Sequence, residues 1–133
     1  MKIKLYFFVL AFLCLPVFAG NTTADVQCAN FMQAAVIDSG KNAVQWETTA
    51  KQINILCGHT DAFELREYAL GWAELLEVNI SLARNDSNTV ILWHTNMAIS
   101  HYEACAHEHG PLAEDANHQA RGLRKARKTL IGH

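Results

Sequence analysis

A run of twenty residues without proline or glycine, residues 90–109, constrains the fold more than any other part of this chain. Its length and the turn-forming residues on both sides predict a single helix. One face of that helix holds His94, Ala98, His101, Cys105 and His109. A neighbouring apolar strip consists of Val90, Trp93, Met97 and Ala104. One helix thus carries both the largest apolar surface and most of the side chains that could do chemistry.

Apolar residues recur with a helical period along the rest of the chain, and strand-like alternation is nearly absent. This spacing and the flanking caps predict further helices at about residues 24–39, 43–57, 61–84 and 111–130. Asp61 and Glu64 have the spacing of a capping box at the start of the third helix, and Pro111 suits the first position of the last. The sequence therefore predicts an all-α, single-domain bundle of four to five short helices.

Residues 1–19 have the pattern of a cleaved secretory signal peptide. Two lysines precede an unbroken apolar run at residues 5–15, and small residues follow it. The run is shorter than the roughly 20 apolar residues of a membrane span, which disfavours the alternative, an uncleaved anchor. We therefore expect a mature domain of residues 20–133 that is periplasmic or secreted, without stable membrane insertion. The short signal favours a bacterial source.

Three cysteines follow the signal: Cys28, Cys57 and Cys105. An exported chain meets an oxidising environment, so we expect one disulfide and one free thiol. Three pairings are possible. Cys28 and Cys57 lie on apolar faces of consecutive predicted helices that turn near Gly40, and we therefore favour the Cys28–Cys57 disulfide.

The chain beyond residue 19 is acidic, with 9 basic and 13 acidic residues and a formal charge of −4. A nucleic-acid binder would show a basic face, so that class is disfavoured. The third predicted helix carries an acidic row: Asp61, Glu64, Glu67, Glu74 and Glu77. This row is either a solvated helix face or a docking surface for a basic protein. The second interpretation places the partner contact at Glu67, Glu74 and Glu77 together with the loop around His59.

A metal site is the alternative use of the histidine face. Residues four apart on a helix can reach one ion, and imidazole and thiolate are ligands for zinc or copper. The candidates are His101, Cys105 and His109. Cys105 is equally suited to a disulfide or to a buried position, and the two histidines are about 12 Å apart along the helix axis, so a complete site would need a ligand from another helix.

An enzyme is not expected, because the sequence lacks the strong catalytic and cofactor motifs. CxxC, CxxCH, HExxH, GxSxG and glycine-rich phosphate loops are all absent. Cys105 with a histidine four residues away could form a thiolate–imidazole pair, but the end of a helix where Cys105 falls raises the pKa of a thiol. We expect no catalytic residues and no cofactor.

The favoured interpretation is a small exported, non-enzymatic binding protein that acts through a protein–protein interface. Inhibitors, immunity proteins and chaperones of the bacterial periplasm are proteins of this kind, a comparison of class rather than of residues. The alternative is a zinc or copper binder that uses His101, Cys105 and His109.

Overall fold

Five helices account for most of residues 22–131, the part of the chain that the computed structural model describes. They are α3 (Thr23–Ile37), α4 (Ala43–Cys57), α5 (Phe63–Ala83), α6 (Asn88–His107) and α7 (Ala113–Ile131). No strand occurs in this range, so the all-α prediction is confirmed. The expected signal peptide, residues 1–19, lies outside the described residues.

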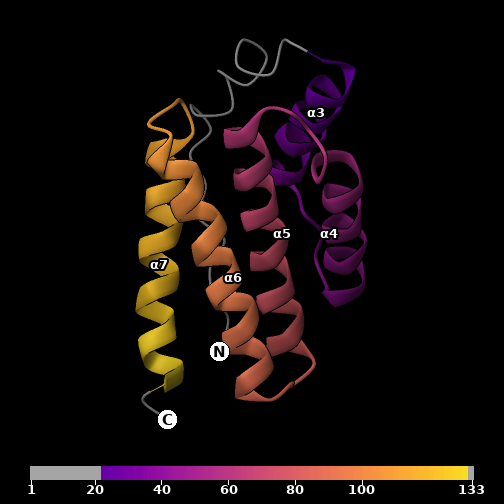
Figure 1. The fold of residues 1–133 in the computed structure, drawn as a ribbon. Helices are drawn as coiled ribbons and strands as arrows, with labels where there is room; N and C mark the ends of the chain where they lie inside the picture. The colour runs from indigo at the N-terminus through magenta and orange to yellow at the C-terminus, as the bar shows by residue number, and fades with distance from the viewer. Residues whose placement is uncertain (1–21, 132–133) are drawn as a thin grey trace.

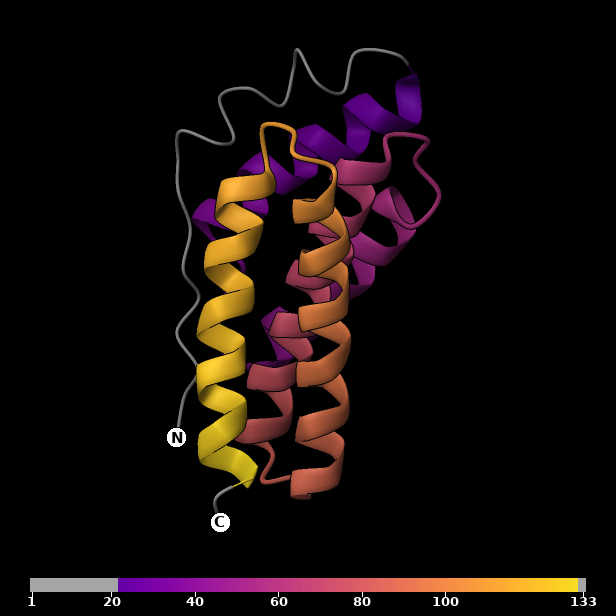
Figure 2. The ribbon, with the colours of Figure 1, turned by 60° about the vertical axis from the view of Figure 1, so that its left-hand side comes forward.

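α5 is the central helix of the bundle. It packs against α4 on one side and α6 on another, and α7 packs against α6 (Figure 1). α3 contacts α4 and α5. Figure 2 shows α6 and α7 side by side, with α3 crossing behind them at an oblique angle. Short connections join successive antiparallel helices, as the helical periodicity predicted.

The core is built mainly on α5, where 13 of 21 residues are buried. Trp72 and Tyr68 are the two largest fully buried side chains, and their rings are stacked with centroids 6.3 Å apart. The Trp72 indole Nε1 donates a hydrogen bond to Ser39 Oγ at 3.0 Å, so the central helix is fixed to the turn between α3 and α4. A buried indole N–H without such an acceptor would cost free energy.

The disulfide joins Cys28 on α3 to Cys57 at the end of α4, with the two Cα atoms 4.9 Å apart. The predicted single disulfide is confirmed, and Cys105 is the free, buried cysteine. A disulfide is compatible with a non-cytoplasmic location. Within residues 22–131, no helix is both long enough and apolar enough to cross a membrane.

The predicted start of the third helix was wrong. α5 begins at Phe63, and its N-cap residue, Ala62, offers no side-chain hydrogen bond. Instead, Asp25 Oδ1 on α3 accepts hydrogen bonds from the backbone N–H groups of Asp61 and Ala62, at 3.1 and 3.2 Å. Glu64 does not complete a capping box, because its carboxylate accepts the Leu112 N–H at 2.6 Å. Contacts with distant residues thus fix the residues around the start of α5, where no local side-chain cap is formed.

The boundaries of the last two helices also differ from the prediction. α6 starts at Asn88, where the Ser87 hydroxyl accepts the Val90 N–H, and ends at His107. His109 lies beyond the end with φ +57°, the left-handed conformation that terminates helices. α7 begins two residues after Pro111, at Ala113. His109 is therefore not on the histidine face that the sequence suggested.

Candidate functional site

α6 carries apolar side chains on two opposite sides. The side toward the core consists of Ile91, Thr95, Ala98, Ile99, Tyr102, Cys105 and Ala106. The strip formed by Val90, Trp93, Met97 and Ala104, which we call the α6 ridge, lies about 150° around the helix. Trp93 is 57 % exposed and Val90 is 39 % exposed, while Met97 and Ala104 are half-buried. The helix therefore presents one aromatic and one aliphatic side chain to solvent, next to two half-buried apolar residues, and contiguous apolar residues of this kind are a feature of recognition surfaces.

Two glutamate–histidine pairs join α5 to α6 on one side of the ridge. Glu74 Oε2 lies 2.6 Å from His94 Nδ1, and Glu67 Oε2 lies 3.1 Å from His101 Nδ1. Glu67 and Glu74 are seven residues apart on α5, and their histidine partners are seven residues apart on α6 in the opposite order. This follows because the two helices are antiparallel, so that the same distance along each helix separates the two pairs. The rings of Trp93 and His94 are in edge contact, with centroids 4.9 Å apart, which links the ridge to this seam.

The acidic row expected on α5 is not a set of freely solvated side chains. Glu64 is buried, Glu67 and Glu74 belong to the histidine pairs, and Glu77 is half-buried. Burial raises the pKa of Glu77, His94 lowers it, and the carboxylates of Glu74 and Glu47 raise it. Glu77 thus lies close enough to His94 and Glu74 to interact with the seam beside the ridge.

His59 is separated from this cluster. It is exposed in the connection between α4 and α5, before the first residue of α5. Phe63 and Glu77 are fourteen residues apart on α5, about 21 Å along the helix axis. The structure therefore does not bring His59 and Glu77 into one contact area.

The three proposed metal ligands are also separated by their surroundings. His101 faces Glu67 in the seam, Cys105 is buried in the core, and His109 is exposed beyond the end of α6. Among residues 22–131, no group of three His, Cys, Asp or Glu side chains is arranged to hold a metal ion. The zinc or copper interpretation thus gains no preformed site from this part of the chain.

Cys105 belongs to a buried polar cluster between α5, α6 and α7. The Tyr68 hydroxyl donates a hydrogen bond to Asp115 Oδ2, and the rings of Tyr68 and Tyr102 meet edge to face with centroids 5.6 Å apart. Burial raises the pKa of the Cys105 thiol, and the nearby carboxylates of Glu64 and Asp115 raise it further. A thiol that keeps its proton is a poor nucleophile and a poor metal ligand.

Asp115 makes the stability of the fold depend on pH. Burial raises the pKa of its carboxyl above the ordinary value of 3.8, although the Tyr68 hydroxyl opposes this. The folded state then holds the proton more tightly than the unfolded state. The stabilising contribution is complete below about pH 4 and is lost as the pH rises through the folded-state pKa. Asp115→Asn should therefore reduce the loss of stability between about pH 4 and pH 7.

Urea unfolding at a series of pH values measures this difference. Glu114→Gln is the matched control, because Glu114 is the adjacent carboxylate on α7 and is exposed. It should change the pH profile far less than Asp115→Asn does, because the Glu114 carboxylate has only a small raising effect on the pKa of Asp115. An Asp115→Asn profile that parallels the wild type throughout would contradict the assignment. Burial also raises the pKa values of Glu64 and Glu77, and both groups contribute to the pH dependence that remains in the variant.

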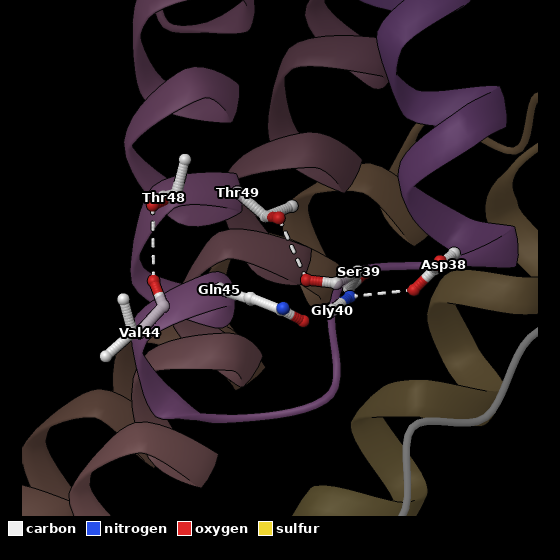
Figure 3. Close-up of a pocket in the computed structure, with 7 residues that line it drawn as sticks. All are labelled: Asp38, Ser39, Gly40, Val44, Gln45, Thr48 and Thr49. Carbon is white, nitrogen blue, oxygen red and sulfur yellow. Dashed lines mark hydrogen bonds between the residues drawn. The ribbon is translucent and has the colours of Figure 1, made fainter.

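A shallow pocket of about 310 Å³ lies at the turn between α3 and α4 (Figure 3). It is lined by Asp38, Ser39, Gly40, Val44, Gln45, Thr48 and Thr49. Its polar groups hold the turn itself: Thr49 Oγ1 donates to the Ser39 carbonyl at 2.8 Å, and Asp38 Oδ1 accepts the Gly40 N–H at 3.0 Å. Gly40 has φ +114°, which side chains rarely tolerate. We therefore interpret this pocket as part of a structural turn.

The exposure of the ridge was missed at the level of sequence. Apolar residues of α6 recur on two faces of the helix, and only one of these faces can pack against the core. A signal for the seam was present, because two glutamates and two histidines are each seven residues apart on consecutive helices. Comparison of the chain with protein-family models, with curated proteins and with solved structures found no match.

Proposed function

We propose that this chain is an exported, non-enzymatic binding protein that acts through a protein–protein interface, of the inhibitor, immunity-protein or chaperone type. The observation that carries the proposal is Trp93, which is 57 % exposed in the α6 ridge. Tryptophan is the residue type most enriched among the side chains that dominate binding energy at interfaces. An apolar centre with a polar rim is the usual anatomy of such an interface, and the Glu67 and Glu74 seam supplies one rim.

The charge distribution favours a basic partner. Residues 22–112 contain 11 acidic and 4 basic residues. Carboxylates at positions 67, 74 and 77 border the α5 side of the ridge, so a basic surface that docks on this side would meet complementary charge. Complementary charge raises the rate of association and selects against acidic proteins. The disulfide and the expected signal peptide support export.

A site-specific crosslink tests this proposal. A photoreactive amino acid is placed at position 93 or, as a matched control, at position 55 in cells that produce the protein. Ile55 suits the control because it is an exposed apolar residue on α4, 66 % exposed and remote from the ridge along the chain. A partner captured from position 93 is identified and purified, and its Kd is measured by titration calorimetry.

We expect Trp93→Ala to weaken that Kd by about 30-fold or more, which corresponds to about 2 kcal/mol. Ile55→Ala should leave the Kd unchanged, and Glu74→Lys should lower both the affinity and its dependence on salt. Equal capture from both positions, or a Trp93→Ala variant that binds as tightly as the wild type, would refute the proposal.

A further inference from the structure

The α6 ridge repeats every seven residues. Val90, Met97 and Ala104 are seven residues apart, and the intervening positions are Trp93, Ser100 and His107. This alternation of three and four residues is the spacing of the a and d positions of a coiled coil, with apolar residues at Val90, Met97 and Ala104 and, among the intervening positions, at Trp93. It continues along nearly the whole of α6, on the side opposite the core. A helix with this pattern can pack lengthwise against a second helix of the same kind.

The two sides of the ridge carry different charges. On the α5 side lie Glu67 and Glu74 with their histidines. On the α7 side, Arg124 Nη1 donates to Glu103 Oε2 at 3.2 Å, and Arg127 Nη1 donates to Asn96 Oδ1 at 2.9 Å. The ridge thus separates an acidic seam from a seam that contains two arginines.

The two seams are matched in height along α6. Glu74 is held at His94 and Arg127 at Asn96, which are two residues apart, or about 3 Å along the axis. Glu67 is held at His101 and Arg124 at Glu103, again two residues apart. Glu74 and Arg127 are therefore offset along the α6 axis by the same small distance as Glu67 and Arg124.

Ridge-to-ridge contact with a second copy allows two kinds of two-fold symmetry. An axis perpendicular to α6 would place the two acidic seams against each other, which like charges oppose. An axis parallel to α6 exchanges the two sides and preserves height. The acidic seam of each copy then faces the arginine seam of the other, with Glu74 opposite Arg127 and Glu67 opposite the Arg124–Glu103 pair. The complementary charge therefore comes mainly from Glu74 and Arg127.

We propose that a second copy of this chain covers the α6 ridge, with the two α6 helices parallel about a two-fold axis and Trp93 at the contact. This inference rests on the proposed function, because both assign binding to the ridge. It adds that a target protein competes with the second copy for Trp93. Self-association thereby regulates access to the recognition surface.

Sedimentation equilibrium of the purified protein at up to about 100 µM tests the pairing. The wild type should form a dimer, and Trp93→Glu should weaken dimerisation by about 30-fold or more. Ile55→Glu, which places the same charge at an exposed apolar position on α4, should dimerise as the wild type does. Circular dichroism confirms that each variant is folded.

A charge exchange tests the orientation. Glu74→Arg alone and Arg127→Glu alone should each dimerise poorly, because both contacts across the axis become repulsive. A mixture of the two variants should form a mixed dimer, since the two substituted side chains then face each other with opposite charges and the other contact is wild-type. An antiparallel pairing would instead bring like-charged seams together, so that each single variant would associate at least as well as the wild type.

Several outcomes would overturn the pairing. These are a monomeric wild type, a Trp93→Glu variant that dimerises normally, or a mixture no more associated than its components. If the wild type is monomeric but position 93 still crosslinks a foreign protein, the self-pairing fails and the proposed function stands. If dimerisation depends on Trp93 but no foreign protein is captured there, the self-pairing stands and the proposed target does not.

Discussion

Trp72→Ala is expected to lower the free energy of unfolding by about 4 kcal/mol. Trp72 is fully buried in the middle of α5, where it stacks on Tyr68 and donates a hydrogen bond to Ser39. Truncation removes the contacts of the indole and leaves a cavity between helices that the disulfide restrains. Urea unfolding followed by circular dichroism measures the loss as a lower midpoint.

Trp93→Ala provides the matched control for this prediction. The same substitution at a position that is 57 % exposed should change the free energy of unfolding by less than about 0.5 kcal/mol. Both variants should be measured at low protein concentration, so that association does not contribute to stability. Similar losses for the two variants would show that the core does not centre on α5.

Removal of the disulfide should cost about 3–4 kcal/mol of stability. The bond closes a loop between residues that are 29 apart in sequence, and its loss gives the unfolded chain more conformational freedom. The double variant Cys28→Ala with Cys57→Ala suits the test, because both sites are buried and alanine adds no polar group. The measured quantity is the urea midpoint relative to the oxidised wild type.

Reduction of the wild type supplies an independent measurement of the same effect. Dithiothreitol should lower the wild-type midpoint toward that of the double variant and should leave the double variant unchanged. A wild-type midpoint that does not respond to a reductant, after thiol counting confirms that the bond is open, would contradict the expected stabilisation.

The parts of the fold that depend on local signals could be predicted from sequence. α4 occupies Ala43–Cys57 as expected, because Asn42 caps its start and Gly58 follows its end. The Cys28–Cys57 bond followed from two apolar faces joined by a short turn. The start of α5 could not be predicted, since Asp25, 36 and 37 residues away in sequence, holds the two residues that precede the helix. A contact from another helix leaves no mark in the neighbouring sequence.

The candidate site was only partly predictable, for a related reason. The spacing of α6 identified the strip that contains Trp93, but periodicity cannot tell which of two apolar faces meets the core. The sequence identified Glu67 and Glu74 as residues of the acidic row, but it did not identify the side chains with which they pair. Pairing with His101 and His94 depends on the antiparallel register of two helices, which is set by packing along their full length.

The contact between Asp25 and the residues before α5 makes the cooperative unfolding of the domain depend on α3. Asp25 lies in the opening turn of α3, yet the amide groups that it satisfies precede the central helix. Detachment of α3 would leave those amides without an acceptor, so the fraying of one helix destabilises the entrance of another. The edge and the middle of the bundle should therefore open as one unit rather than in succession.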